Sequence, residues 1–424
     1  MLELLIIADD YTGALDTGVQ FSASGARTCV VTDLSYDFQQ NSADAEVIVI
    51  DTESRHIASY KAYQIVRGLA ERAIAAGVPH IFKKTDSALR GNIGSELTAL
   101  LDASGETVLP FVPSFPKMNR VSQDGILYID GEPLENSVFR QDPFEPMKKS
   151  FIPDIIAEQS GVRTDVIRTG KRDELDVPEK RIAVYDCSTD RQMAGIAKRL
   201  RGRNRLKILA GCAGFASVLP AALDLTLKKT TEVLQADCLF AVCGSVNPIT
   251  VRQLDYAEEN GFRRFRLTAQ QKLQEGYWKT KQGEKELAAL LDEAVKERVC
   301  VVDSNDLPDR RDTVNFAVDH NITDEVLRKL IPASLGEVMK GRMERLPKAA
   351  LMIMGGDTLM GFFRLMGITM VEPVTELFPG TVLSRFSLNG ESYQVVSKSG
   401  GFGRETLLAD LEKLVVKNKE EEKC

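Results

Sequence analysis

The stretch "IFKKTDSALRGNIGSEL", residues 81–97, decides the fold class. It begins with an apolar run, continues through a loop of charged residues and glycine, and ends in a sequence with helical spacing. Other apolar runs alternate with helical patterns along the chain, for example with "YKAYQIVRGLAERAIAAG" at 60–77. Strands that alternate with helices are typical of α/β proteins with a largely parallel sheet. The sequence therefore predicts an α/β fold.

Two domains are expected from the length of the chain and from a break in its pattern. A chain of 424 residues with 43% hydrophobic content is long enough to bury more than one core. The periodicity is lost near 224–237, and "CLFAVCGS" then begins a new series of strands. We predict domains at 1–230 and 236–424, each with a largely parallel sheet flanked by helices, and an active site in the cleft between them.

Charge and composition exclude several classes of partner. The chain has 54 basic and 61 acidic residues, a net charge of -7 and no long basic run, so we expect no nucleic acid and no membrane surface as partner. Seven scattered cysteines and three histidines suggest neither a disulfide framework nor a zinc site. The N-terminus lacks the basic start of a signal peptide, and no apolar stretch reaches about 18 residues. A cytoplasmic protein is expected, and a homo-oligomer is left open.

Two clusters of polar residues follow apolar strands in the first half of the chain. They are "IIADDYTGALDTG" at 6–18 and "KKTDSALRGN" at 83–92. Ligands of open α/β sheets bind outside the carboxyl ends of the strands, so both clusters could line one crevice. Carboxylates accept hydrogen bonds from a polyol, and arginine can bind a carboxylate or a phosphate through two parallel bonds. The candidate substrate-binding residues are Asp9, Asp10, Thr12, Gly13, Lys84, Asp86, Ser87, Arg90 and Gly91.

The alternative for these clusters is a structural role. Asp and Thr after a strand are common helix N-caps, Gly13 can serve a turn, and 83–92 can form a solvated loop. A helix needs only one capping side chain, however, and a second adjacent carboxylate adds repulsion that a cation or a polyol must offset. The adjacent pair of Asp9 and Asp10 therefore favours a binding site.

Glycine ends three apolar strands in the second half of the chain. The stretches are "AVCGSVNPIT" at 241–250, "MIMGGDTLMG" at 352–361 and "VVSKSGGFG" at 395–403. Glycine lets backbone N–H groups approach a phosphate closely, and a helix that starts after "GGDT" adds the positive end of its dipole. None of these stretches is a familiar nucleotide fingerprint, and any one of them alone could be a turn. Together they predict an anion cradle.

The ordered set "IIADDYTGA", "KKTDSALRGNIGSEL", "GSVNPITVRQL", "GGDT", "ELFPG" and "KSGGFG" resembles the four-carbon acid sugar kinase family. That family includes D-threonate, D-erythronate and 3-oxo-tetronate kinases, and the resemblance extends from residue 4 to about residue 410. It implies an N-terminal acid-sugar domain, a C-terminal ATP domain and transfer of the γ-phosphoryl group to the terminal 4-hydroxyl of a tetronate. The ATP-binding positions that it implies are Gly244, Ser245, Gly355, Gly356, Asp357, Thr358, Lys398, Gly400 and Gly401.

The resemblance leaves the chemistry of some residues open. We expect Arg90, helped by Lys84, to pair with the carboxylate of the sugar acid, while Asp9, Asp10 and Asp86 hold its hydroxyls. The catalytic base is Asp10, Asp86 or Asp357. Mg²⁺ needs only one or two carboxylates besides the nucleotide phosphates, so no ligand cluster is required, and its ligands are not assigned. Cys212 in "AGCAGFAS" departs from the small hydroxyl residue expected there, which puts a polar role of that stretch in doubt.

Two other classes of protein are alternatives to a kinase. A non-catalytic sensor of sugar acid and nucleotide could use the first crevice, but it would not need three glycine cradles in the second half. A dehydrogenase would need a glycine fingerprint after the first strand, where "ADDYTGA" instead places two negative charges. The residue types do not distinguish the tetronate stereoisomers, because an inverted hydroxyl changes only the geometry of pairing.

Overall fold

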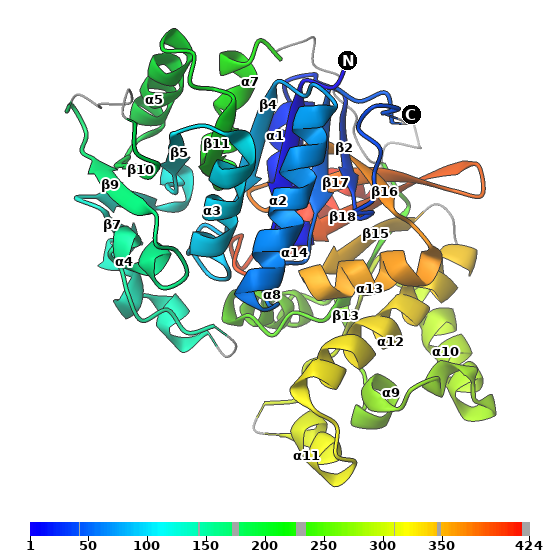
Figure 1. Ribbon diagram of the computed structural model, residues 1–424. Coiled ribbons are helices and arrows are strands. Elements are labelled where there is room, and N and C mark those ends of the chain that lie inside the picture. Colours follow the sequence, from blue (N-terminus) through cyan, green and yellow to red (C-terminus); the bar gives the residue numbers. More distant parts are fainter. Residues whose placement is uncertain are drawn as a thin grey trace. The chain divides into compact units, whose positions relative to one another are not determined.

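The computed structural model describes residues 1–41, 43–142, 145–171, 178–225, 235–308, 310–345 and 349–417. The chain divides into two compact units, Met1–Thr230 and Thr231–Cys424, drawn in blue to green and in green to red in Figure 1. The predicted domain limit at residue 230 lies outside the described residues.

The N-terminal unit is built on a parallel sheet. Every strand of this sheet pairs with its neighbours in the parallel direction. In spatial order the strands are β2 (Thr28–Val31), β3 (Val47–Asp51), β1 (Leu4–Ala8), β4 (His80–Lys84), β11 (Ile208–Gly211), β5 (Val108–Val112), β10 (Arg181–Tyr185) and β9 (Arg163–Ile167). All five residues of β1, "LLIIA", are buried, as expected of a central strand that is covered on both faces.

Helices connect and cover these strands (Figure 1). They are α1 (Tyr11–Ser22), α2 (Ser59–Ala75), α3 (Ile93–Ser104), α4 (Ile152–Ala157), α5 (Asp190–Gly202), α6 (Ala213–Ala216) and α7 (Leu219–Ala222). Helix α2 buries Ala62, Val66, Leu69 and Ala73, which are three or four residues apart and therefore share one face. Gly77 follows the end of α2 with a φ of 79°, the left-handed conformation that ends many helices.

A small antiparallel sheet interrupts the N-terminal unit. It consists of β6 (Arg120–Gln123), β7 (Ile126–Ile129) and β8 (Glu132–Pro133), flanked by the short 3₁₀ helices η1 (Pro116–Met118), η2 (Leu134–Asn136) and η3 (Val138–Gln141). Asp124 and Gly125 join β6 to β7, and both have positive φ, as the two-residue turn of a hairpin requires.

The C-terminal unit has a mixed sheet. Its strands are, in spatial order, β13 (Arg263–Arg266), β14 (Val299–Asp303), β12 (Cys238–Cys243), β15 (Ala349–Met354), β18 (Glu391–Lys398), β17 (Thr381–Leu388) and β16 (Met370–Phe378). The first five are parallel, whereas β17 and β16 are antiparallel to their neighbours. The antiparallel pair was not predicted. Asn389 and Gly390, both with positive φ, make the tight turn that reverses the chain between β17 and β18.

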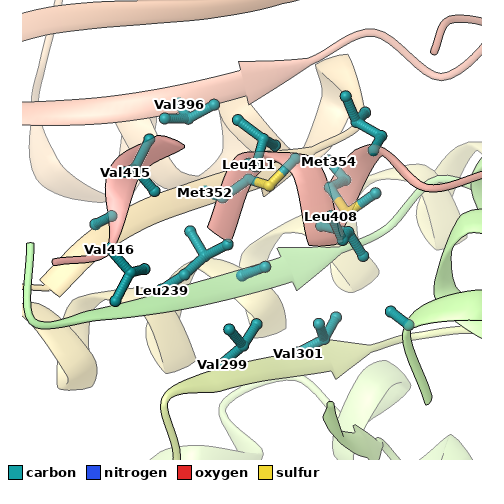
Figure 2. Close-up of a cluster of buried hydrophobic side chains, with 14 of the residues drawn as sticks. Leu239, Val299, Val301, Met352, Met354, Val396, Leu408, Leu411, Val415 and Val416 are labelled. Atoms are coloured by element: carbon teal, nitrogen blue, oxygen red, sulfur yellow. The ribbon is translucent and has the colours of Figure 1, made fainter. Parts of the chain in front are cut away.

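The core of this unit lies between its sheet and α14 (Leu407–Val415). Figure 2 shows Leu408, Leu411 and Val415 of this helix in one cluster with Met352 of β15 and Val396 of β18. The remaining helical segments are α8 (Pro248–Glu259), α9 (Ala269–Leu273), η4 (Tyr277–Lys279), α10 (Lys281–Ala294), α11 (Asp312–Asp319), α12 (Asp324–Arg345) and α13 (Gly356–Met366). The predicted α/β class, with mostly parallel strands flanked by helices, is confirmed.

The described cysteines are free thiols. Cys29, Cys187, Cys212, Cys243 and Cys300 are buried, and Cys238 is partly buried. Within the ranges that the structure describes, no helix combines the length and the apolar character needed to cross a bilayer.

Candidate active site

Adjacent strand ends bring the two predicted clusters of the N-terminal unit together. Strands β1 and β4 are parallel neighbours, and Ala8, the last residue of β1, pairs with Lys84, the last residue of β4. Asp9 directly follows β1 and Asp86 lies two residues beyond β4, so both lie at the same edge of the sheet. Both are buried, with 1% and 7% exposure. Asp10 caps α1 by accepting a hydrogen bond of 3.2 Å from the N–H of Gly13.

Arg55 neutralises this cluster. Its Nε donates to Oδ2 of Asp9 at 2.7 Å, its Nη2 donates to Oδ1 of Asp10 at 2.6 Å, and Nη2 lies 3.8 Å from Oδ1 of Asp86. Only 11% of the Arg55 side chain is exposed. Gly91, with a φ of 89°, makes room for it, since a Cβ there would lie 3.0 Å from Cγ of Arg55. One guanidinium thus forms ion pairs with three carboxylates.

The cations hold two of these carboxylates in the charged form. Burial acts to raise the pKa of Asp9, but Arg55, Lys84 and Lys83 outweigh it and lower that pKa to about 2. Burial likewise opposes the ionisation of Asp86, yet Arg90 and Arg55 bring its pKa well below the usual range. Both side chains are therefore anions at neutral pH and act as hydrogen-bond acceptors.

Arg90 is held by two carboxylates. Its Nε and Nη2 donate to the two oxygens of Asp86 at 2.7 and 3.1 Å, and its Nη1 donates to Oδ2 of Asp142 at 2.8 Å. The guanidinium also lies over the ring of Phe139, 5.1 Å from its centroid. Arg120 faces the same ring at 5.2 Å and donates a hydrogen bond to the hydroxyl of Ser87. Arg90 is thus fixed at the cluster before any ligand binds.

Lys84 and Asp9 present polar atoms that other described residues do not satisfy. Nζ of Lys84 lies 3.8 Å from Oδ1 of Asp9 and 3.9 Å from Oδ1 of Asp10, beyond hydrogen-bond distance. Among the described residues, Oδ1 of Asp9 is buried without a hydrogen-bond donor. Gly13 permits this approach, because a Cβ there would overlap Nζ of Lys84. A hydroxyl group fits here, since it can donate to Asp9 and accept from Lys84.

A buried ion pair lies behind the cluster. Nζ of Lys83 is 3.0 Å from Oε2 of Glu96, and both side chains are almost fully buried. Lys83 also donates to the carbonyl of Ile7 at 3.2 Å, and Ser54 donates to Glu96. Burial raises the pKa of Glu96. These contacts tie α3, β4 and the loop after β3 to the end of β1, so they fix the geometry of the carboxylates in front of them.

Part of this arrangement differs from the sequence-based prediction. The unpredicted residues that contact the cluster are Arg55, Glu96, Arg120 and Asp142. Arg55 had an available signal, because "VIVIDTESR" is a third apolar strand with polar residues at its end. Cys212 has no polar role toward a ligand, since its buried thiol donates to the carbonyls of Pro113 and Ser114 at 3.2 Å each.

The three glycine-containing stretches of the C-terminal unit meet at the ends of β12, β15 and β18. Gly244 donates through its N–H to the carbonyl of Met354 at 3.1 Å, and Gly355 donates to that of Lys398 at 3.1 Å. A Cβ on Gly400 would lie 3.0 Å from Oγ of Ser245. These strand ends, the loops that follow them and the first turn of α13 hold the predicted residues Gly244, Ser245, Gly355, Gly356, Asp357, Thr358, Lys398, Gly400 and Gly401.

Helix α13 begins in this group of loops. Thr358 in its first turn is buried, and a Cβ on Gly244 would overlap its hydroxyl, so glycine is required there. Asp357 is exposed, and among the described residues its carboxylate has no hydrogen-bond or ion-pair partner. The positive end of the α13 dipole and the nearby backbone N–H groups favour an anion at this place.

Lys398 is a buried cation with neutral partners. It is fully buried, and its Nζ donates to Oγ1 of Thr250 at 2.6 Å and to the carbonyl of Gly400 at 3.0 Å. No carboxylate of the described chain forms an ion pair with it. Burial lowers its pKa to about 7. A buried ammonium without a counter-charge fits a site that receives a polyanion such as the ATP phosphates.

Replacing Lys398 by methionine is expected to stabilise the ligand-free protein by on the order of 2 kcal/mol at pH 7. From about pH 7 to pH 10.5 the unfolded chain keeps a proton that folded Lys398 loses, so the stability of the wild type rises through this window. The difference in unfolding free energy between the variant and the wild type should therefore shrink as the pH rises. Urea unfolding at pH 7, 8 and 9 measures it.

The contrasting variant is Lys272→Met. Lys272 is equally buried, but its Nζ pairs with Oδ1 of Asp306 at 2.7 Å. Its loss leaves a carboxylate without its partner and should destabilise the protein. Equal destabilisation by Lys398→Met and Lys272→Met would show that the burial of Lys398 does not lower the stability of the protein.

A metal ion would depend on few protein ligands. In the part of the chain that the structure describes, no three His, Cys, Asp or Glu side chains gather in a metal-binding group. Mg²⁺ usually keeps several waters and binds through one or two carboxylates together with substrate phosphates. The lack of such a group among the described residues is therefore compatible with Mg²⁺.

Comparison with known proteins matches both units to families. Residues 4–219 match a family described as a sugar-binding N-terminal domain, and residues 240–408 match one described as a nucleotide-binding C-terminal domain. The chain belongs to the four-carbon acid sugar kinase family. As such a kinase, it is a phosphotransferase with an alcohol group as acceptor.

Three related kinases align with this chain, two of them over nearly its whole length and one over about three fifths of it. A D-threonate kinase of Salmonella typhimurium is 28% identical and covers 96% of this chain and 97% of its own. A D-erythronate kinase of Heliobacterium modesticaldum is 32% identical over 62% of this chain and 61% of its own. A 3-oxo-tetronate kinase of Burkholderia multivorans is 26% identical over 94% of each chain.

Solved structures share the fold of this kinase. A protein from Salmonella typhimurium LT2 superimposes with a TM-score of 0.76 at 21% identity, over 97% of this chain and 99% of its own. A Haemophilus influenzae protein gives a TM-score of 0.70 at 20% identity, over 97% of this chain and 100% of its own.

Proposed function

We propose that this kinase uses ATP and Mg²⁺ to phosphorylate the terminal 4-hydroxyl of a four-carbon sugar acid in the cytoplasm. The observation that carries the proposal is the pair of unsatisfied polar groups at the ends of β1 and β4. Oδ1 of Asp9 is buried without a donor among the described residues, and Nζ of Lys84 lies 3.8 Å away without an acceptor among them. The substrates in the names of the three relatives supply hydroxyl groups and a carboxylate that fit these atoms.

Within this proposal, the cations bind the acid group and the carboxylates bind the hydroxyls. Arg90, helped by Lys84, pairs with the substrate carboxylate, because both cations lie at the same edge of the sheet. Asp9, Asp10 and Asp86 accept hydrogen bonds from the hydroxyls. Each charge-assisted hydrogen bond contributes about 1.5–3 kcal/mol, so a few of them suffice to hold a small, strongly hydrated molecule.

The nucleotide lies, in this proposal, in the glycine loops of the C-terminal unit. The N–H groups of these loops and of the first turn of α13 face the phosphates. Buried Lys398, which donates to the carbonyl of Gly400, supplies positive charge beside the loop that follows β18. Phosphoryl transfer needs mainly positioning and charge neutralisation, because charge is spread over the transferring oxygens. The loops and the buried lysine provide these two contributions.

We assign the catalytic base to Asp357 among the three candidates. Asp86 is bonded to both nitrogens of one edge of Arg90, and its low pKa makes it a weak proton acceptor. Asp10 is engaged by Arg55, Thr12 and the N–H of Gly13. Asp357 is the candidate whose carboxylate has no such partner among the described residues. It can therefore accept a proton without breaking an existing contact.

The experiment that tests the function is ADP release from Mg-ATP with a panel of acids. The panel contains D- and L-threonate, D- and L-erythronate and their 3-oxo forms, with a control that lacks acid. We expect acid-dependent ADP release with one member, and NMR should locate the new phosphate ester on the 4-oxygen. Failure of every acid while ATP still binds would overturn the substrate class, and failure to bind ATP would overturn the nucleotide site.

A further inference from the structure

Helix α8 buries polar side chains where a helix ordinarily buries apolar ones. Its buried face consists of Thr250, Gln253, Leu254 and Ala257, which follow helical spacing. The two polar residues lie at the N-terminal end of this face, and both are 0% exposed. A buried hydroxyl or amide is costly unless it is hydrogen-bonded, so its partners indicate why it is there.

Both side chains donate to carbonyls of the loop that follows β18. Oγ1 of Thr250 donates to the carbonyl of Gly400 at 2.8 Å. Nε2 of Gln253 donates to the carbonyls of Phe402 and Arg404, at 3.0 and 2.9 Å. The close approach of Gln253 requires a glycine at 403, because a Cβ there would lie 2.9 Å from Nε2. Three alternate carbonyls of the loop therefore point toward one helix.

The direction of these carbonyls fixes the direction of the N–H groups. In a trans peptide the C=O and the following N–H point in opposite directions, and the described chain has no cis peptide. The N–H groups of Gly401 and Gly403 therefore point away from α8. Neither has a backbone or side-chain acceptor among the described residues. The loop thus presents two donors on the side opposite the helix.

Thr250 also joins this loop to the other strand ends. Its Oγ1 accepts a hydrogen bond of 2.6 Å from Nζ of Lys398, and Oγ of Ser245 lies 3.3 Å from it. Ser245 follows β12, and Lys398 ends β18. One hydroxyl on α8 therefore sets the spacing between two of the glycine loops.

We propose that Thr250 and Gln253 are positioning residues that hold the loop at 400–404 so that the N–H groups of Gly401 and Gly403 bind the phosphates of the nucleotide. Neither side chain touches the nucleotide; both act through the peptide groups that they orient. The proposal rests on the nucleotide site of the proposed function, and it adds the residues that give that site its shape.

The test is the affinity of the full chain for Mg-ADP, measured by isothermal titration calorimetry. Thr250→Val removes one hydrogen bond to the loop and Gln253→Met removes two, with little change in volume. Each variant should weaken ADP binding by about tenfold or more, since one hydrogen bond contributes a net of roughly 1 kcal/mol. Thr250→Ser keeps the hydroxyl and should bind ADP within about threefold of the wild type. In steady-state assays the KM for ATP should rise in the first two variants, while the KM for the acid stays unchanged.

Ser384→Ala is the matched control. Ser384 lies on β17 of the same unit and is fully buried, but its hydroxyl has no hydrogen-bond partner among the described residues. Its replacement removes a buried hydroxyl without removing a bond to the loop, so ADP affinity should not change. A second measurement needs no variant: hydrogen exchange of the segment 399–404 in the wild type should slow when ADP binds.

The outcomes separate this proposal from the proposed function. Weaker ADP binding in Thr250→Val or Gln253→Met, with normal binding in Thr250→Ser and Ser384→Ala, would support the positioning role. Wild-type affinity in both of the first two variants, or exchange at 399–404 that ADP does not slow, would overturn it while leaving the nucleotide site intact. A wild type that binds no ADP would overturn the proposed function, and this proposal with it.

Discussion

Replacing Arg55 by methionine is expected to lower the free energy of unfolding at pH 7 by about 3–5 kcal/mol, the cost of removing one partner from a buried ionic network. Arg55 bonds to Asp9 and Asp10 and lies 3.8 Å from Asp86. Without it, two aspartates lose a charge-assisted bond while all three carboxylates remain close together. Kinase activity should fall as well, because the same carboxylates form the proposed substrate site.

The pH dependence of this variant identifies the cause. In the wild type the pKa of Asp9 is lowered to about 2 from 3.8, so Asp9 contributes stability that is present above about pH 4 and lost as the pH falls through 2. In Arg55→Met burial is less opposed, so the pKa of Asp9 should rise. The loss of unfolding free energy in the variant, relative to the wild type, should therefore be largest near pH 7 and shrink toward pH 3. Urea unfolding across this range measures it.

Arg67→Met is the control for the loss of an arginine. Arg67 pairs with Glu71 on the surface of α2, with about half of each side chain exposed, and such pairs contribute about 0–1 kcal/mol. We expect almost no change in stability. A similar loss in both variants, or a deficit in Arg55→Met that does not depend on pH, would contradict the central role of Arg55.

Replacing Asp357 by asparagine is expected to lower kcat by about 100- to 10,000-fold, the usual contribution of a general base. Asparagine keeps the size of the side chain but cannot accept the proton, so the KM for the acid should change little. Asp10→Asn and Asp86→Asn remove acceptors for the substrate hydroxyls, and these two variants should mainly raise the KM for the acid. Steady-state kinetics of the three variants, with the acceptor found by the panel, separates the roles.

Two results would contradict the assignment of the base. A large fall of kcat in Asp10→Asn or Asp86→Asn alone would move the base to that residue. Near-normal kcat in all three variants would show that the transfer needs no carboxylate base, as a loose transition state permits. Glu405→Gln is the control, because it removes an exposed carboxylate of the same unit that pairs with Arg252 on the surface.

The position of residues at or just after the end of a strand could be predicted from the sequence. Asp9 and Lys84 could be placed together because parallel strands end at one edge of a sheet, and the same rule indicated the glycine loops of the second half. Glu96 could not be assigned in this way, because it lies within a helix and not at the end of a strand. Arg55 lies just after an apolar strand and had this signal, but its partners are 45 and 46 residues away in sequence, so the sequence did not identify them.

The fold itself was predicted less completely in the second half. The class followed from the alternation of strands and helices, but the antiparallel strands β16 and β17 were overlooked. The dipeptide Asn389–Gly390 was the available signal, since this pair favours the tight turn of a hairpin. The buried polar residues of α8 could not be predicted either. Thr250 and Gln253 have the residue types of an exposed helix face, and only the structure shows that they bind the loop after β18.

The burial of the thiols makes the opening of each unit separately observable. A cysteine is alkylated as its thiolate and only where the reagent has access. Burial raises the pKa of Cys187 to about 11 and that of Cys300 to about 12, so both should react only when the surrounding structure opens. Cys187 belongs to the N-terminal unit and Cys300 to the C-terminal unit. The labelling rates of their two peptides therefore compare the local stability of the units in one sample, without an engineered probe.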